Sequence, residues 1–510
     1  MKRNLSKSKY TAFRQCPKIL WLKTYMPDME VIDDALQSRF ESGNEVGDLA
    51  MGLFGDFEEV TSFDADDRLD LGEMIRKTAD CLARGVENIC EASFSWDGNY
   101  CAVDILRKQG DGYAIYEVKS SSNSYSQPLK AADLNHYAWD IAYQKYVLTQ
   151  CGVKVTGVYL VQLNSDYVRD SHLDIQQLFI KTDMKDLVDL EYPDVPANIQ
   201  RAKAILSDTR EPAMDFSKAC RKPYPCAFWQ YCSRNLPSPS VFDLYGIWFS
   251  IALKHYKNQL VTFEDIQSLK LNDIQSLQVN SHLSGEGHIN KKGIRNFLDQ
   301  NITYPLYFLD FETMQDVIPQ YEGTKPYQQI PFQYSLHWIE TPGGELKHTA
   351  FLAESGTDPR RDLAEKLCKD IPLNVCTTAF NKGFECARIK ELAGMYPDLS
   401  YHLMNIHDNV VDFLDPFRAG YYYLPSMEGS FSIKKVLPAL FPDDPELNYT
   451  NLTGSVHNGT QAMTIFPKIK DMEPDEQIKA RQALLEYCHL DTLAMVRIWQ
   501  KLEEISQGND

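Results

Sequence analysis

Residues 304–313 read Tyr-Pro-Leu-Tyr-Phe-Leu-Asp-Phe-Glu-Thr, an apolar run that ends in two carboxylates, Asp310 and Glu312. The run predicts a buried β-strand, and residues i and i+2 of a strand point to the same face. The two acids are therefore expected side by side at the strand end. Close carboxylates repel each other unless a positive charge lies between them, and their hard oxygen atoms suit Mg²⁺ or Mn²⁺. The pair alone suggests a metal site, and the rest of the chain decides its significance.

The chain as a whole has the composition of a globular protein with ample core. Its 510 residues are 44% hydrophobic and 24% charged, and this length favours two to four domains. The formal charge of −19 argues against a protein that coats nucleic acid through bulk attraction. It does not argue against a nuclease, because metal-binding carboxylates themselves add negative charge.

The start of the chain carries no recognisable export signal. Met1-Lys2-Arg3 is basic, but Asn4 to Tyr10 contains no apolar core of the needed length. The apolar stretch from Leu244 to Leu253 is too short to cross a bilayer. Twelve cysteines without an export signal indicate a reducing compartment, in which thiols bind metals or are simply buried. We therefore expect a cytoplasmic protein with no membrane partner.

The pattern along the chain predicts an α/β protein with three parts. Residues 1–235 alternate helical and strand patterns and close with a cysteine cluster. Residues 236–302 begin with Leu-Pro-Ser-Pro-Ser, which is typical of a linker, and continue as short amphipathic helices. Residues 303–510 begin with the apolar strand and end in a long helix over residues 474–504, which has Pro at its first position.

A second acidic pair lies in the first of these parts. Residues 100–106 and 112–118 predict a β-hairpin with a Gly-rich turn. The first strand carries Asp104, and the second carries Glu117 on the same face as Lys119. Two acids and a lysine on adjacent strands can hold a metal, orient a water and stabilise charge at a scissile phosphate. An exposed hairpin edge with an ordinary cross-strand salt bridge would have the same pattern.

A helix predicted over residues 131–148 follows this hairpin and places Asp140 and Gln144 on one face. An Asp, then Glu-x-Lys, then such a helix resembles the PD-(D/E)xK nuclease fold, specifically its RecB-like branch. The resemblance implies that the two hairpin acids are metal ligands and that the hairpin lysine is catalytic. It also implies one catalytic residue from the helix. Gln144 matches that motif best, and Asp140 and Tyr146 remain alternatives.

The resemblance departs from the family in one respect. RecB-like nucleases usually carry a metal-binding histidine in an early helix, and the comparable residues 43–48 contain none. Glu45 lies in that segment and could substitute as a ligand. If it does not, the first site is slow or inactive.

Four cysteines near the two ends of the first part form another candidate site. Three lie in a short, Pro-containing segment, and the fourth lies near the start of the chain. Four thiolates can hold zinc or an iron–sulfur cluster, whereas four unrelated buried thiols would need no metal. The arrangement resembles iron–sulfur RecB-like nucleases, which implies a 4Fe–4S cluster that staples the two ends of the domain. Zinc stays open because the spacing differs from the commonest pattern of those families. The candidate ligands are Cys16, Cys220, Cys226 and Cys232.

The opening acidic pair acquires partners further along the chain. Glu385 lies just inside a predicted helix start, after a probable strand over residues 374–380. Tyr487 and Asp491 are four residues apart and share one face of the last helix. Four converging carboxylates can hold two metals roughly 3.5–4 Å apart, one activating water and the other stabilising the leaving 3′ oxygen. The alternative is a core strand, a loop acid and a surface helix without chemistry.

These motifs resemble the DnaQ-like, DEDD-type 3′–5′ exonucleases of the RNase H-like fold, over most of residues 303–505. The resemblance implies a site of the tyrosine subtype, in which Tyr487 positions the attacking water. Glu385 stands where the family has Asp, and its longer side chain shifts the geometry of that ligand. The implied metal ligands are Asp310, Glu312, Glu385 and Asp491.

Three neighbouring features have two interpretations each. Asp412 is either a reserve ligand or a surface acid that caps a helix. Residues 430–435 either contact phosphate through hydroxyls and lysines or form a capped, solvated helix start. Gln333 lies on a second predicted strand and could face the substrate, or it could be an ordinary strand residue.

The whole chain resembles a bacterial family that fuses a RecB-like nuclease module to a DnaQ-like domain once labelled as of unknown function. The resemblance implies a metal-dependent nuclease that hydrolyses phosphodiester bonds, with DNA favoured over RNA and single strands or ends favoured as substrates. The alternative is an iron–sulfur-stapled scaffold that binds nucleic acid and cuts only at the C-terminal site. A pure adaptor disagrees with the presence of all four C-terminal acids.

Overall fold

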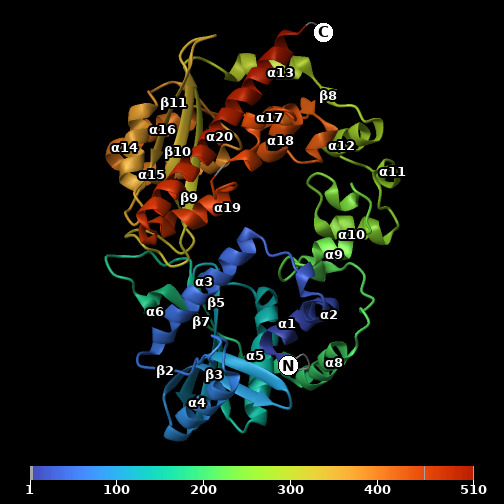
Figure 1. Cartoon of the computed structure of the whole chain (residues 1–510), viewed down its shortest axis with the longest axis vertical. Coiled ribbons are helices and arrows are strands. Elements are labelled where there is room, and N and C mark those ends of the chain that lie inside the picture. Colours follow the sequence, from blue (N-terminus) through green and yellow to red (C-terminus); the bar gives the residue numbers. More distant parts are fainter. Residues whose placement is uncertain (1–3, 453, 509–510) are drawn as a thin grey trace. The chain divides into compact units, whose positions relative to one another are not determined.

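The computed structural model describes residues 4–452 and 454–508, so the basic start Met1-Lys2-Arg3 lies outside the described residues. Helices and mixed sheets alternate along the chain, and the expected α/β class is confirmed (Figure 1). The chain divides into two compact units. The first comprises Met1–Asn235 and Asp316–Gln328, and the second comprises Leu236–Gln315 and Gln329–Asp510.

The first unit is built on a seven-stranded mixed sheet in the order β2-β3-β4-β5-β6-β7, with β1 paired to β4. The strands are β1 (Leu5–Ser6), β2 (Glu58–Glu59), β3 (Asn88–Trp96), β4 (Asn99–Gln109), β5 (Gly112–Asn123), β6 (Val155–Asn164) and β7 (Phe179–Asp183). β4 and β5 pair antiparallel, which confirms the predicted hairpin, and β5 runs parallel to β6.

Helices cover this sheet and supply its core. They are α1 (Lys7–Gln15), α2 (Pro17–Tyr25), α3 (Asp34–Met51), α4 (Leu71–Arg84), α5 (Ala131–Gln150), α6 (Ile175–Leu178), α7 (Lys185–Glu191), α8 (Val195–Ser207) and α9 (Trp229–Ser233). α5 confirms the helix expected after the hairpin, and it buries Ile141, Tyr143 and Val147 in the main core. α1 begins at Lys7, directly after β1, because the Ser6 hydroxyl caps it by accepting a hydrogen bond from the backbone N–H of Lys9.

Residues 316–328 were assigned by sequence to the third part, yet they group with the first unit. The Tyr327 hydroxyl donates a 2.6 Å hydrogen bond to the carbonyl of Ser120. Val317 and Ile318 are buried in the same hydrophobic cluster as Val46 of α3. An excursion between two neighbouring strands therefore completes the core of the first unit.

The second unit contains a five-stranded mixed sheet in the order β11-β10-β9-β12-β13. The strands are β9 (Leu306–Gln315), β10 (Gln329–Ile339), β11 (Leu346–Leu352), β12 (Cys376–Ala379) and β13 (Val410–Asp412). The predicted apolar strand is confirmed as β9, the middle strand, with Leu306, Phe308 and Leu309 fully buried. β9 pairs antiparallel with β10 and parallel with β12. The long C-terminal helix, α20 (Pro474–Gln507), lies along this sheet (Figure 1).

The remaining helices surround the sheet or precede it. They are α10 (Phe249–Lys257), α11 (Phe263–Ile266), α12 (Asp273–Ser284), α13 (Lys291–Asn301), α14 (Arg360–Asp370), α15 (Gly383–Met395), α16 (Pro397–Asp408), α17 (Asp415–Arg418), α18 (Ile433–Leu440) and α19 (Gly459–Ile465). The segment 236–302 has a small core of its own, and its strand β8 (His288–Ile289) pairs with β14 (Tyr422–Tyr423). Within residues 4–452 and 454–508, no helix has both the length and the hydrophobicity needed to cross a bilayer.

Candidate functional site

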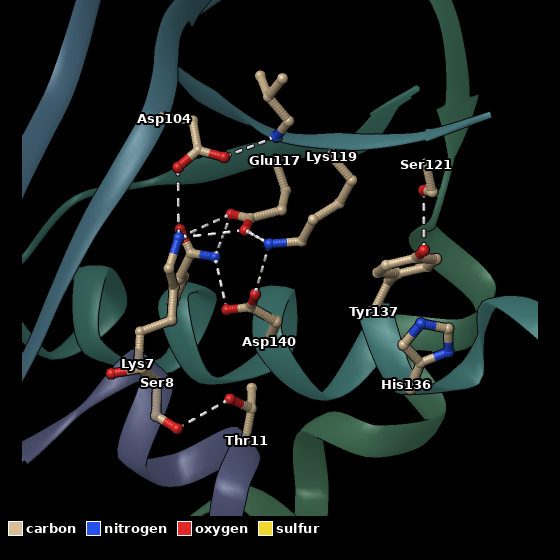
Figure 2. A network of polar contacts seen from close by, with 12 residues as sticks. Lys7, Ser8, Thr11, Asp104, Glu117, Lys119, Ser121, His136, Tyr137 and Asp140 are labelled. Carbon is tan, nitrogen blue, oxygen red and sulfur yellow. Dashed lines mark hydrogen bonds and ion pairs between the residues drawn. The ribbon is translucent and has the colours of Figure 1, made fainter. Parts of the chain in front are cut away.

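The acids and the lysine expected from the hairpin come together in the first unit (Figure 2). The Lys119 ammonium contacts the Glu117 carboxylate, and its Nζ lies 3.2 Å from Oδ2 of Asp140 on α5. Oδ2 of Asp104 accepts a 2.7 Å hydrogen bond from the backbone N–H of Val118. This backbone contact fixes the Asp104 carboxylate beside β5, next to the other two side chains.

Helix α5 supplies two residues to this cluster. Nε2 of Gln144 donates hydrogen bonds to Oε2 of Glu117 at 2.6 Å and to Oδ1 of Asp140 at 3.1 Å. Tyr146 lies instead against Tyr192, with the two ring centroids 6.4 Å apart. The structure thus brings Gln144 and Asp140 to the site and leaves Tyr146 out of it.

Lys7, which the sequence reasoning missed, completes the cluster. Its Nζ lies 3.3 Å from Oδ1 of Asp104, and 3.1 and 3.2 Å from the two carboxylate oxygens of Glu117. An ammonium group therefore lies between the two acids, where a metal was expected. Burial alone would raise the pKa of Glu117, but Lys119 and Lys7 hold that pKa well below its usual value.

The cluster nevertheless contains more acids than bases. Burial, with the nearby Glu117 carboxylate, raises the pKa of Asp140 to about 6. Burial, with the nearby Asp104 carboxylate, raises the pKa of Glu91 on β3 to about 7. Two ammonium groups therefore face four carboxyl groups, and this excess of acid favours a further cation.

Glu45, the proposed substitute for the missing histidine, is located on α3. Burial raises its pKa, and the nearby Asp316 carboxylate adds to that rise. Among the contacts of the described residues, no hydrogen bond or ion pair joins Glu45 to the cluster. Whether Glu45 acts as a ligand beside Asp104 and Glu117 stays a prediction.

The four candidate cysteines line one small cavity of about 30 Å³. Burial raises the pKa of Cys226 to about 11. Among the described residues, no three of these sulfur atoms form a group with all separations within 4.8 Å. A tetrahedral zinc site with Zn–S bonds of about 2.3 Å needs sulfur atoms roughly 3.8 Å apart. The thiols thus converge, but with a wider spacing than zinc requires.

The second site lies at β9 and α20 of the second unit. The candidate ligand atoms of Asp310, Glu312 and Cys488 all lie within 4.8 Å of one another. The Cys488 thiol donates to the backbone carbonyl of Asp310 at 3.7 Å. Asp491 lies on the same helix, and Glu385 lies in the first turn of α15. Asp491 and Glu385 lie near enough to act on the charge of Asp310, while the group with all ligand atoms within 4.8 Å comprises Asp310, Glu312 and Cys488.

The electrostatics of the second site reflect this convergence. Burial raises the pKa of Asp310 well above its usual value, and Asp491, Glu312 and Glu385 add to that rise. Burial also raises the pKa of Glu385 to about 8 and that of Asp491 to about 6. Oε2 of Glu385 is buried without a hydrogen-bond partner, so this oxygen atom is available to a cation.

The second site also contains Tyr449, which the sequence did not indicate, and Lys434, whose segment had two interpretations. The Tyr449 hydroxyl donates a 2.5 Å hydrogen bond to Oδ1 of Asp491.

Nζ of Lys434 lies 5.4 Å from the ring centroid of Tyr449 and 5.3 Å from that of Tyr487. The Lys434 ammonium also lowers the pKa of Asp491. α18 begins without a capping bond from the Ser432 side chain. The start of α18 is solvated, as one interpretation expected, although the Ser432 side chain does not cap it, and a phosphate contact of residues 430–435 stays a prediction.

Asp412 and Gln333 have supporting positions. Asp412 is buried, and its Oδ1 accepts hydrogen bonds from the backbone N–H groups of Asn381 at 2.8 Å and Leu414 at 2.9 Å. Its interpretation as a surface acid is therefore wrong, because it orients the turn before Glu385. Gln333 is buried opposite Glu312, and its Nε2 donates a 2.8 Å hydrogen bond to the carbonyl of Leu484 on α20.

Comparison with known proteins identifies similarity in parts of the chain. Residues 307–432 match a family model described as a domain of unknown function (DUF2779), and this segment contains Asp310, Glu312 and Glu385. The uncharacterized protein UU173 of Ureaplasma parvum serovar 3 is 26% identical over 216 residues. That match covers 38% of this chain and 30% of the relative's own length. No solved structure matches the chain significantly.

Proposed function

We propose that the chain is a metal-dependent nuclease whose second unit hydrolyses phosphodiester bonds from the 3′ end of nucleic acid. The observation that carries this proposal is the convergence of four carboxyl groups, Asp310, Glu312, Glu385 and Asp491. Burial raises the pKa of each of them above its usual value. Such a group of ionised acids is stable only when cations neutralise it.

The residues present fit hard divalent cations. The donor atoms are carboxylate oxygens, and one of them, Oε2 of Glu385, is buried without a partner. Asp310 and Glu312 with Asp491 would hold Mg²⁺ or Mn²⁺, and Glu385 would complete the set. Bound metals of this kind activate water and stabilise the leaving oxygen.

The other side chains of the second site have roles that fit this chemistry. Tyr449 fixes one oxygen of Asp491 through its hydrogen bond and so helps to orient this carboxylate. Tyr487 is four residues before Asp491 on α20 and can hold the attacking water. Lys434 provides a positive charge near the acids, which favours a phosphate group.

The sheet supports the RNase H-like resemblance as well. The acidic pair lies on β9, which has antiparallel strands on one side and parallel strands on the other. β13 ends at Asp412, which orients the turn before Glu385. Neighbouring strand ends thus position two of the motifs.

The first unit supports a second, PD-(D/E)xK-type site, because Asp104, Glu117, Lys119 and Gln144 are assembled there. One observation favours the alternative in which the first unit only binds nucleic acid. Lys7 lies between Asp104 and Glu117. In that alternative, Lys7 takes the place of the metal and only the second unit cuts.

We also propose that the four cysteines hold a 4Fe–4S cluster. The supporting observation is that all four line one cavity. Such a cluster would staple the turn between α1 and α2 to residues 220–232, which run into α9. The use of cysteine further favours a cytoplasmic location.

DNA is the favoured substrate, with single strands or ends favoured over internal duplex. A chain with a formal charge of −19 fits a processing enzyme with a local site better than a tight duplex binder.

A nuclease assay on end-labelled single- and double-stranded DNA and RNA, with Mn²⁺ or Mg²⁺, tests the proposal. Asp310→Ala should reduce 3′–5′ degradation by roughly 10³-fold or more, and Asp299→Ala, at an exposed acid of the same unit, should not. Persistence of the activity in Asp310→Ala would refute the DEDD-type assignment. If Lys119→Ala changes nothing in that assay, the first unit is a scaffold.

A further inference from the structure

Three histidines of the second unit form a cluster separate from the carboxylates. His337 lies on β10, His348 on β11 and His489 on α20, and their candidate ligand nitrogens all lie within 4.8 Å of one another. His337 and His348 are direct partners in the register between β10 and β11. The ring centroids of the three pairs are 4.4 to 4.7 Å apart. Three secondary-structure elements thus direct imidazoles to one point.

The distances within the cluster match those of a shared metal ion. Nδ1 of His489 lies 3.2 Å from Nε2 of His348. Two nitrogens that bind one tetrahedral zinc ion at about 2.0–2.1 Å are roughly 3.3–3.4 Å apart. A small relaxation of either ring would therefore let both nitrogens face one cation.

Hydroxyl groups orient the most deeply buried ring. Nδ1 of His337 lies 2.8 Å from Oγ1 of Thr492, which in turn lies 2.7 Å from Oγ of Ser335. This leaves Nε2 of His337 as the candidate ligand atom, and a ligand histidine usually bonds through its other nitrogen in this way. Ser335 also reaches Nε2 of His348 at 2.9 Å, a contact that a bound metal would replace.

The three rings are suited to act as neutral ligands. Burial, with the two neighbouring imidazoles, lowers the pKa of His337 to about 3. Partial burial of the His348 ring, with the nearby His489, lowers the pKa of His348 to about 4, although the side chain as a whole stays exposed. At neutral pH the lone pairs of these rings are therefore free of protons, as metal binding requires.

We propose that His337, His348 and His489 bind one divalent transition-metal ion of the zinc class. Imidazole nitrogens suit zinc and related ions, whereas Mg²⁺ prefers oxygen atoms, so this site and the carboxylate site select different metals. A cavity of about 580 Å³, lined by His348 and His489 among others, adjoins the cluster and gives an ion and a fourth, water ligand access from solvent. The ion would fasten β10 and β11 to α20, the helix that carries Tyr487 and Asp491.

Cobalt titration of the full-length, chelator-treated protein tests this proposal, because Co²⁺ replaces zinc and absorbs visible light. Excess Mg²⁺ is present throughout to occupy the oxygen sites. The wild type should bind one more equivalent of Co²⁺ than His348→Ala and than His489→Ala. The component that is lost should have d–d bands without the sulfur-to-metal charge-transfer band of the cysteine site. His407→Ala, at a histidine on α16 of the same unit, should bind as the wild type does.

Two results decide the outcome. A Co²⁺ affinity of His348→Ala that is more than about 100-fold weaker than that of the wild type, beyond the loss typical of an outer-shell partner, supports the site. The proposal is overturned if His348→Ala binds as many equivalents of Co²⁺ as the wild type and gives the same spectrum. It is also overturned if His407→Ala loses as much Co²⁺ as His348→Ala does. His348 is exposed on β11, so this variant is expected to fold even if His489→Ala, in the long helix, does not.

Discussion

Nζ of Lys7 lies 3.1 Å from Oε1 of Glu117, although 110 positions of the chain separate the two residues. β1 brings them together, because Leu5 and Ser6 pair in parallel with the first residues of β4 and α1 begins immediately afterwards. Glu117 is fully buried, so the ammonium provides charge compensation that water cannot. Any metal that binds Asp104 and Glu117 must share these carboxylates with Lys7 or displace it.

The first prediction concerns the Lys7 ammonium, which occupies the place between Asp104 and Glu117 where a metal was expected. Lys7→Met should lower the free energy of unfolding by about 1–3 kcal/mol, because it leaves buried carboxylates without one of their two cations. Added Mg²⁺ should restore more stability to Lys7→Met than it adds to the wild type. Urea unfolding with and without Mg²⁺ measures both effects.

Lys154→Met is the matched control for this experiment, since Lys154 forms an exposed ion pair with Asp111 in the same unit. It should change the free energy of unfolding by less than about 1 kcal/mol. If Lys7→Met behaves like this control, Lys7 does not compensate the acidic cluster.

The second prediction is a pH dependence of the metal-free protein. A carboxyl group whose pKa is higher in the folded state destabilises the fold as pH rises from its unfolded pKa, about 4, to its folded pKa. The folded pKa is about 8 for Glu385 and about 6 for Asp491. In the presence of a chelator, the free energy of unfolding should therefore fall by about 5–8 kcal/mol between pH 4 and pH 8.

Urea unfolding at several pH values tests this dependence. Mn²⁺ should flatten it, because the metal binds the ionised carboxylates. Glu385→Gln should make it shallower without metal, since Asp491 still contributes, whereas Glu286→Gln, at an exposed position of the same unit, should leave it unchanged. A stability that rises with pH over this interval would contradict the assignment of buried, mutually repelling acids.

The third prediction concerns Tyr449. Tyr449→Phe removes the hydrogen bond to Asp491 and should weaken Mn²⁺-dependent nuclease activity by roughly 10-fold, which corresponds to about 1.4 kcal/mol. The loss should be larger at limiting than at saturating Mn²⁺, since the bond orients a metal ligand. Tyr401→Phe, at an exposed tyrosine of the same unit, serves as the control. If Tyr449→Phe is as active as Tyr401→Phe, the Tyr449 hydroxyl has no role in the site.

The fourth prediction concerns the cysteine cavity. Anaerobically purified protein should be brown with a broad visible absorbance, and Cys226→Ser should lose both the colour and the bound iron. Cys151→Ser, at an exposed cysteine of the same unit, should retain them. Iron and zinc contents measured on the same samples complete the test. Colourless wild-type protein whose zinc content falls by one per chain in Cys226→Ser would replace the cluster with a zinc site.

Residues close in the sequence could be placed from the sequence, because strand and helix periods fix their directions. The i, i+2 spacing put Asp310 beside Glu312, and the i, i+4 spacing put Asp140 beside Gln144. The hairpin turn then positioned Asp104 against β5. In each case one local element or one tight turn determines the geometry.

Residues that join a site through a distant chain segment carried no such signal. Lys7 is the first residue of a short helix, and only the pairing of β1 with β4 brings it to Glu117. Tyr449 lies in a single 3-10 turn without periodicity. The histidine cluster combines a predictable strand pairing with a helix more than a hundred residues later, and helix packing against a sheet is not encoded by local spacing.

The segment Asp316–Gln328 has a consequence for dissecting the protein. The chain passes from one unit to the other three times, after Asn235, after Gln315 and after Gln328. A truncation that begins at Leu236 would therefore carry Val317 and Ile318 without the apolar partners that bury them. The units are interlaced in sequence, and separate expression of the second requires replacing this excursion with a short turn between β9 and β10.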